Sequence, residues 1–573
     1  MARKRSGDEL KKDIREKNGR FYAYRSTSEM VGGKKVTKTE YLGPYDPNTD
    51  TVKEKRVRGK QRSKADISVS KEEMDVKSLL KGISFKQYGN VDLLDTIQRR
   101  SRLGRDLTLS FGSSAKPILC SAMAVALNGS TFMNIEDTME RSFIREMYGS
   151  KATYDSPSMS EFAHRIGTCN DNIDSFFEYR VGASEGMLAW DTTTKGTYSL
   201  LDGLAEWARS KDDERIPMVK KALATDGRGV PALFEIYPGT MSDMATMKQM
   251  VDRIRRYGRE DLMLVMDRGF GSGANIHLLN AEHTSFVMPA NTNMKTIKAI
   301  MSEFQKRKND RRVFDSHAYD VWETELAVVI NDDSFNTDGE QMYAIVAAGD
   351  APPEAELVRA YVCYDSKKYS DEVQRVRVMV DELVAKLEMI DSKDPMREFT
   401  RITGKAKKYF DAEADGRKLR FSVKNNAMSF AENRAGLFVM LSSTDVGWER
   451  MMSAYDARRL VEQNFDFDKA DDRRFRTGDS VTMMGREFIR FVALIMKCEI
   501  AAVLRDTGIN NSVNGVLDTL STVPAAGRDG DWTVMRMTKK CRDLYSVFDM
   551  QRRSEPLFYD DVCHPAEVIE AFD

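Results

Sequence analysis

The chain has few cysteines and histidines, and none of them has the spacing of a metal-binding motif. Its six cysteines are scattered over 573 residues without a Cys-x2-Cys pair. This argues against a zinc ribbon and against a secreted disulfide scaffold. The five histidines are equally dispersed, so each is interpreted as a structural or surface residue. This cysteine usage is typical of a protein in a reducing cytoplasm.

A long hydrophobic run is also absent. The first residues, MARKRSGDEL, are polar and do not have the pattern of a signal peptide. The most apolar predicted helix, near Phe488–Leu504, is interrupted by Arg490, Lys497 and Glu499. We therefore expect this helix in a protein core and not in a membrane.

The whole chain has no excess of one charge, but its first part does. The formal net charge is −1, whereas residues 1–64 contain 19 Lys and Arg against 9 Asp and Glu, a local net charge of +10. Within them, Phe21–Arg25 and Lys34–Leu42 flank Gly32-Gly33 and predict a hairpin. Because local basic surface is what binds nucleic acid, residues 1–65 are interpreted as a DNA-binding module. A solvated terminal hairpin is the alternative.

A charged row is predicted on one helix near the end of the chain. Its members have the spacing Tyr-x2-Arg-x3-Glu-x6-Lys and are Tyr455, Arg458, Glu462 and Lys469. At about 100° per residue they share a stripe roughly 60° wide, and the apolar residues of the segment fall on a separate arc. One carboxylate among cations fits a site where a metal ion lies among phosphates. The alternative is a solvated face with salt bridges.

Two aspartates each follow a short apolar run upstream of this helix. Residues 186–190 (GMLAW) lead into Asp191, and residues 262–266 (LMLVM) lead into Asp267. Such runs are typical of strands buried on both faces, and ligands of α/β sheets commonly bind at the carboxyl ends of strands. The pattern predicts that each aspartate ends a strand and that the two converge. A plain turn residue is the alternative for either one.

The order of these elements predicts an α/β fold with a ribonuclease-H-like catalytic core. A strand at Gly229–Tyr237 and a helix from Ser242 lie between the two acidic strands, and the acidic helix follows much later. The segments MLAWDTTT, ALFEIYPGTMSD, LVMDRGF and YDARRLVEQ resemble those of bacterial insertion-sequence transposases of the fourth family, which belong to the DDE class. The resemblance spans about Gly182 to Leu504, with a large unmatched stretch before the acidic helix.

The resemblance implies a site and a reaction. Asp191, Asp267 and Glu462 would be the catalytic acids and the ligands of Mg²⁺, for which Mn²⁺ can substitute. Tyr455, Arg458 and Lys469 would contact DNA phosphates. Apart from the resemblance, charge alone makes Arg268, Arg473, Arg474 and Arg476 further candidates for DNA contact, with a solvated surface as the alternative. Trp322 is a candidate for stacking on a displaced base, with ordinary strand packing as the alternative. The protein would bind terminal inverted repeats as a homodimer, cleave the transposon ends and join their 3′ hydroxyls to target DNA by two-metal transesterification, in the bacterial cytoplasm at the nucleoid.

A chain of this length predicts several domains. The interval of 195 positions from Asp267 to Glu462 exceeds what a plain core needs, so an insertion is expected there. The predicted organisation is a basic module at 1–65, a helical DNA-end-binding or dimer region at 66–180, core parts at 181–290 and 436–510, a β-rich insertion with one long helix at 291–435, and a helical region at 511–573.

Two other functions remain open from the sequence. A ribonuclease-H-like structure-selective nuclease or resolvase would use the same three acids but would need neither the basic module nor the Tyr–Arg–Lys row. A domesticated DNA-binding protein would keep the fold without the activity, although all three acids are present here.

Overall fold

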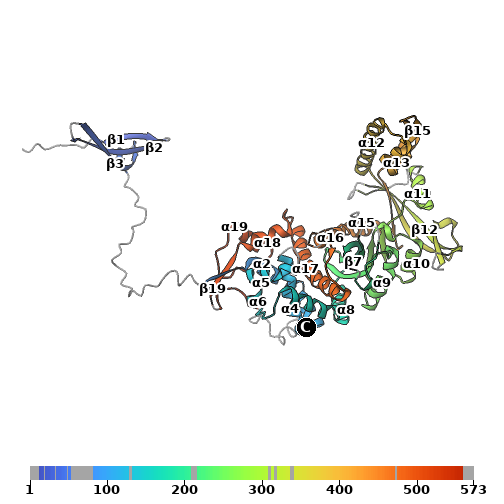
Figure 1. Cartoon of the computed structure of the whole chain (residues 1–573), viewed down its shortest axis with the longest axis horizontal. Helices are drawn as coiled ribbons and strands as arrows, with labels where there is room; N and C mark the ends of the chain where they lie inside the picture. Colours follow the sequence, from blue (N-terminus) through green and yellow to red (C-terminus); the bar gives the residue numbers. More distant parts are fainter. Residues whose placement is uncertain are drawn as a thin grey trace, which may run out of the picture. The chain divides into compact units, whose positions relative to one another are not determined.

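The computed structural model describes most of the chain, and Figure 1 shows the course of its elements. The described residues are 12–17, 20–31, 34–47, 49–52, 82–127, 132–199, 201–207, 216–306, 312–314, 319–335, 341–471, 474–528 and 530–558. The chain divides into two compact units, Met1–Lys81 and Gly82–Asp573. The domain boundary expected at residue 65 falls among residues 53–81, outside the described residues.

The first unit is an antiparallel sheet with the strand order β1-β2-β3-β4. Its strands are β1 (Lys12–Lys17), β2 (Arg20–Val31), β3 (Lys34–Asp46) and β4 (Thr51–Val52). β2 and β3 pair from Phe21↔Tyr45 to Val31↔Lys34, which confirms the predicted hairpin and extends it. The expected Gly32-Gly33 turn lies outside the described residues.

The second unit contains a mixed sheet of eleven described strands, so the chain has a mixed α/β fold. One half of this sheet, from the edge strand β8 inward, has the order β8-β7-β6-β9-β10. These strands are β6 (Met187–Thr197), β7 (Met218–Asp226), β8 (Pro231–Pro238), β9 (Met263–Met266) and β10 (Phe286–Pro289). β7 is antiparallel to β6 and β8, whereas β6, β9 and β10 run parallel. β9 is buried throughout, as its continuous apolar run predicts.

The same sheet continues into the region predicted as an insertion. Its further strands are β11 (Arg312–Phe314), β12 (Tyr319–Phe335), β13 (Gln341–Ala347), β14 (Glu356–Asp365) and β17 (Leu437–Ser442). β10 pairs antiparallel with β17, β17 with β14, and β14 with β12. The strands predicted near 321–330, 342–348 and 359–364 are therefore not a separate sheet, whereas the one predicted at Leu419–Val423 pairs with Phe410–Asp415 in a small sheet of its own. The first three extend the central one because β17 satisfies the backbone groups along the outer edge of β10.

The remainder of the insertion, residues 366–434, forms what we call the insertion subdomain. Its elements are α12 (Ser366–Glu388), α13 (Pro395–Thr403), η7 (Gly404–Tyr409), β15 (Phe410–Asp415), β16 (Lys418–Val423) and α14 (Asn425–Arg434). It has its own core, in which Val380, Leu383 and Leu387 of α12 pack with Phe399 and Phe410. The apolar face of the predicted long helix is thus used within the chain. The sequence did not predict α13, α14 or α11 (Lys295–Lys306).

Helices before and after the sheet segments form one helical region. Its elements are α2 (Gly89–Arg100), α3 (Leu103–Phe111), α4 (Ala115–Leu127), α5 (Ile135–Arg141), α6 (Ile144–Met147), α7 (Ser156–Gly167), α8 (Asn170–Gly182), α17 (Ser480–Asp506), α18 (Val513–Ser521) and α19 (Lys539–Val547), with a small sheet of β5 (Ser84–Gln87), β19 (Pro524–Arg528) and β20 (Asp531–Val534). α17 is mostly buried, as expected of a core helix. α17 packs closely on α7 at two glycines, Gly485 of α17 and Gly167 of α7. A Cβ on Gly485 would lie 1.8 Å from the backbone oxygen of Ala163 in α7, so neither helix has room for a side chain there.

Candidate active site

Asp191 and Asp267 lie side by side on neighbouring strands. β6 and β9 are parallel and pair as far as Trp190↔Met266. The next residue along each strand is an aspartate, so Asp191 and Asp267 lie opposite each other. Asp267 follows the end of β9, as predicted. Asp191 does not end its strand, because β6 continues to Thr197. The three β-branched threonines that follow Asp191 favour the extended backbone, which the prediction of a strand end overlooked.

The charged row lies on two helices and not on one. α15 (Trp448–Ala457) ends before Arg458, and α16 (Arg459–Asp471) begins after it. At the junction the backbone N–H of Arg458 donates to the backbone carbonyl oxygen of Tyr455, and that of Val461 donates to the carbonyl oxygen of Arg458. These i→i+3 bonds are tighter than those of a continuous α-helix. The predicted stripe therefore crosses a one-residue tightening of the helix at its arginine, whose own backbone stays helical with φ −55° and ψ −32°.

Arg458 brings the three acids together. Its Nη2 lies 3.2 Å from Glu462 Oε1, 3.3 Å from Asp267 Oδ1 and 3.8 Å from Asp191 Oδ2. Since all three oxygens lie that close to one nitrogen, the two aspartate oxygens are at most 7.1 Å apart, the sum of their two distances. The predicted convergence of the acids is present. The Arg458 side chain, however, is only 10% exposed, so it is not the outward-facing cation that the stripe predicted.

The charges of this cluster support one another. Burial lowers the pKa of Arg458, but the acids and Tyr455 around it outweigh burial, and its pKa is raised overall. Burial also raises the pKa of Tyr455. Asp267 and Glu462 raise it further, while Arg458 lowers it. The Tyr455 hydroxyl therefore stays protonated at neutral pH, and the single positive charge of Arg458 offsets only part of the charge of the three carboxylates.

The chemistry of this donor set fits a hard divalent cation. Three carboxylates offer only oxygen ligands, which Mg²⁺ prefers over nitrogen or sulfur. The side chains of Asp267 and Glu462 are 46% and 59% exposed, so an ion and water can reach them. Among the described residues, no three acidic, histidine or cysteine side chains are arranged closely enough to hold one ion together. In this arrangement the acids converge on Arg458 instead.

The other predicted site residues lie at varying distances along the chain. Arg268 is exposed in η4 (Arg268–Phe270), and its backbone nitrogen donates to Asp267. Arg474, in β18 (Arg474–Phe475), donates to the Tyr198 hydroxyl, and the exposed Arg476 follows it. β18 pairs with the end of β6. Lys469 belongs to α16, but its side chain and all of Arg473 lie outside the described residues.

Trp322 lies in β12, two strands beyond β17 in the sheet. Its backbone is opposite Val362 of β14. The side chain is half-buried and packs against the main hydrophobic core. This placement satisfies the packing interpretation without testing the base-stacking one.

A buried charge network next to the acids was not predicted. Lys195 of β6 and Lys221 of β7 meet Asp468 of α16 and Glu487 of α17, at 2.5 Å for Lys195–Asp468 and 2.7 Å for Lys221–Glu487. Arg490 completes the set, with Nε 3.6 Å from Glu487. All five side chains are at most 5% exposed. In the sequence, the only sign of the network is that charged residues interrupt otherwise buried segments.

The network holds the acidic helix on the acidic strand. Lys195 lies four residues after Asp191, on the same face of β6 because side chains alternate along a strand. Asp468 lies six residues after Glu462 on α16. The Lys195–Asp468 pair therefore joins the two elements whose acids converge at Arg458.

Comparisons with known proteins identify one matching family. The model described as a transposase DDE domain matches residues 189–484, which is 296 of the 573 residues. No curated protein matches the sequence. Among solved structures, a cryo-EM structure of the piggyBac transposase synaptic complex with hairpin DNA is similar, with 11% identity and a TM-score of 0.33 over 84% of this chain and 86% of that chain.

Proposed function

The chain belongs to the DDE transposase family, and from this we propose that it binds the terminal inverted repeats of an insertion sequence, cleaves the ends and joins their 3′ hydroxyls to target DNA. Members of the family are enzymes that generally use divalent metal ions. The observation that carries the proposal is the convergence of Asp191, Asp267 and Glu462 around one guanidinium nitrogen. The three acids come from separate parts of the chain and meet where β6 and the end of β9 lie close to α16.

We assign the half of the sheet from β8 to β10 to a ribonuclease-H-like core. The supporting features are the antiparallel run β8-β7-β6, the parallel neighbours β9 and β10, and an acidic helix packed on β6. The insertion between β10 and β17 lengthens this core without interrupting the acidic site. The Tyr–Arg–Glu–Lys signature further supports membership of the fourth insertion-sequence family.

Asp191, Asp267 and Glu462 would hold Mg²⁺, or Mn²⁺ in its place. When bound, divalent ions at such a site activate the attacking oxygen and stabilise the leaving oxygen of an in-line displacement at phosphorus. In the DNA-free chain Arg458 offsets part of the charge of the three carboxylates, and it would offer a cation to a phosphate that enters the site. Tyr455, beneath this guanidinium at 5.8 Å from ring centroid to Cζ, limits where it can move.

Further residues are proposed to contact DNA around the acids. They are Lys469, Arg268, Arg473, Arg474 and Arg476, with Trp322 retained as a candidate for stacking on a displaced base. Arg268 is supported by its exposure directly after Asp267. The first unit is proposed to bind the inverted repeat, and two copies of the chain to assemble on paired ends.

Replacing Arg458 tests its role as the counter-ion of the acids. Arg458→Met is expected to destabilise the metal-free protein by on the order of 1–2 kcal/mol, because three neighbouring carboxylates lose their cation while solvent still screens Asp267 and Glu462. Adding Mg²⁺ should then raise the melting temperature more in the variant than in the unaltered protein. The exposed neighbour Arg459→Met is the matched control. Equal Mg²⁺ responses in all three proteins would contradict the assignment.

The proposed function is tested with the DNA that flanks the gene. The purified chain and Mg²⁺ are incubated with labelled duplexes carrying the flanking repeats and with a plasmid target. We expect a cut at the repeat end that leaves a 3′ hydroxyl, followed by its joining to the plasmid. A chain of residues 66–573 should bind the repeat at least about tenfold more weakly, because it loses basic contacts to phosphates.

Other outcomes would contradict the proposal in distinguishable ways. Cutting of branched DNA regardless of the repeats would identify a structure-selective nuclease. Repeat binding without any cutting would identify a domesticated DNA-binding protein. Equal affinity with and without residues 1–65 would transfer end binding to the second unit.

A further inference from the structure

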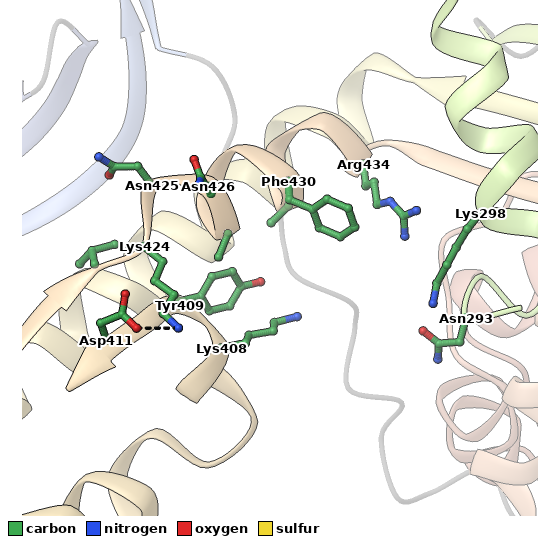
Figure 2. A pocket seen from close by; sticks show the side chains of 13 residues that line it. Asn293, Lys298, Lys408, Tyr409, Asp411, Lys424, Asn425, Asn426, Phe430 and Arg434 are labelled. Carbon is green, nitrogen blue, oxygen red and sulfur yellow. Dashed lines mark ion pairs between the residues drawn. The ribbon is translucent and has the colours of Figure 1, made fainter. Parts of the chain in front are cut away.

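A large open cleft separates α11 from the insertion subdomain. Its volume is about 1010 Å³. Figure 2 shows Asn293 and Lys298 on one side, with Lys408, Phe430 and Arg434 across from them. Lys298 belongs to α11, Lys408 to η7, and Phe430 and Arg434 to α14. The cleft is thus formed by elements that the chain reaches more than a hundred residues apart.

The lining of the cleft is basic. Its cations are Lys298, Lys408, Lys424 and Arg434, and its one acid among the described lining residues is Asp411. Asp411 pairs with Lys424 at 2.7 Å, so the lining keeps a net charge of +3. Lys298 and Lys408 are exposed. Three asparagines add neutral hydrogen-bond donors, and the Arg434 guanidinium lies 4.5 Å from the centre of the exposed Phe430 ring.

Both walls of the cleft connect to strands of the large sheet at the strand ends where the acids lie. β10 is parallel to β9, and Val287 pairs with Val265, so the end of β10 at Pro289 is level with Asp267. α11 follows directly from this end. β17 is antiparallel to β10, with Met440 opposite Pro289, so the chain enters β17 at the same edge, directly after α14. The cleft and the acids therefore lie at the same end of the strands of this sheet.

We propose that this cleft binds the sugar-phosphate backbone of the donor DNA that flanks the transposon end, beyond the scissile phosphate. The inference rests on the proposed function. Small-molecule pockets are mostly apolar and enclosed, whereas this cleft is wide and cationic and has amides to donate to phosphate oxygens. A duplex whose cleaved phosphate lies at the acids extends along this end of the sheet to either side. The cations in the cleft then neutralise its phosphates at a distance from the reaction.

Phe430 adds an apolar surface to this cationic lining. Its side chain is 59% exposed, and Arg434 over the ring keeps it in the cleft. An exposed ring between phosphate-binding cations fits the apolar face of a deoxyribose.

The test compares end duplexes that stop at the cleavage position with duplexes that continue for at least one helical turn of flank. Binding is measured by fluorescence anisotropy over a series of salt concentrations, with Ca²⁺ in place of Mg²⁺. The variant is Lys298→Glu with Lys408→Glu, one change on each wall. The control is Lys386→Glu with Lys393→Glu, which makes the same charge change at exposed positions of the insertion subdomain outside the cleft.

The unaltered chain should bind the flanked duplex more tightly than the unflanked one. The cleft variant should lose this gain, on the order of tenfold at moderate salt, and its salt slope should fall by about two, because each phosphate contact releases about one counterion. Its affinity for the unflanked duplex should be unchanged, and the control should match the unaltered chain.

Several results would overturn the inference. Equal losses in the variant and the control would attribute the effect to net charge. Equal losses on both duplexes would place the transposon end in the cleft. If the same variant is also run in the plasmid-joining assay described above, a defect confined to joining would place target DNA there. If the unaltered chain neither binds nor cuts ends, the proposed function fails instead.

Discussion

Asp191→Asn, Asp267→Asn and Glu462→Gln proteins are each expected to bind transposon ends and to leave them uncut. Each change keeps the size of the side chain but removes one of the negative oxygens that converge at Arg458. Loss of charge stabilisation at a metal-assisted phosphoryl site is worth several kcal/mol. A loss of about 4 kcal/mol slows cleavage about a thousandfold. The measurement is single-turnover cutting of a labelled end duplex.

The matched control for these acids is Asp466→Asn. Asp466 lies on α16 with Glu462 but is not one of the acids that meet Arg458, so its charge should not affect the reaction. Cleavage within tenfold of the unaltered rate in any of the three acid variants would remove that residue from the site. Loss of end binding in the same variants would indicate misfolding, which circular dichroism would reveal.

The second large effect is expected from the buried charge network. Asp468 balances three buried cations together with Glu487, and both lysines lie within 3.1 Å of it. Asp468→Asn leaves Lys195, Lys221 and Arg490 with one carboxylate among them. Removing one partner of a buried ion pair costs about 3–5 kcal/mol. The free energy of unfolding of this chain, measured in urea, should fall by that amount.

The buried network has one more cation than it has carboxylates, and this excess positive charge provides an internal control. Lys221→Met removes one of three cations and leaves two cations with two carboxylates, so it should destabilise the chain less than Asp468→Asn. Asp466→Asn on the same helix should have almost no effect. If Asp468→Asn and Asp466→Asn unfold at the same urea concentration, the network does not stabilise α16 on the sheet.

The network should also contribute to acid unfolding. Burial would raise the pKa of Asp468, but Lys195, Lys221 and Arg490 outweigh burial and lower it. The same cations lower the pKa of Glu487. A folded-state pKa below the unfolded one means that the stabilisation is present above the unfolded value, about 4, and is lost as the pH falls below it. The Asp468→Asn protein should therefore lose less stability between pH 6 and pH 3 than the unaltered protein.

Local periodicity was enough to locate the acids and the strands that carry two of them. The apolar run before Asp267 is β9, the run before Asp191 is the first four residues of β6, and the basic hairpin is β2–β3. These elements are dictated by residues next to one another in the chain. The family was also readable from the sequence, because the spacing of Arg458 and Glu462 and the segments around the aspartates are local patterns.

What the sequence did not determine are the features that depend on distant partners. The burial of Arg458 and its contacts with Asp191 and Asp267 depend on which groups face it across the fold. Likewise, Lys195 finds Asp468 only after the chain has passed through the whole insertion.

The insertion shows the same division. Its strand segments were visible from their β-branched residues, but whether they formed a sheet of their own or joined the central one depended on the unpaired edge of β10. That edge takes β17 because unsatisfied backbone groups in a core are costly. Local sequence therefore determined where most of these strands lie and which acidic residues stand in or after them. Only the tertiary structure decided what each of them meets, because burial and charge pairing are set by residues hundreds of positions away.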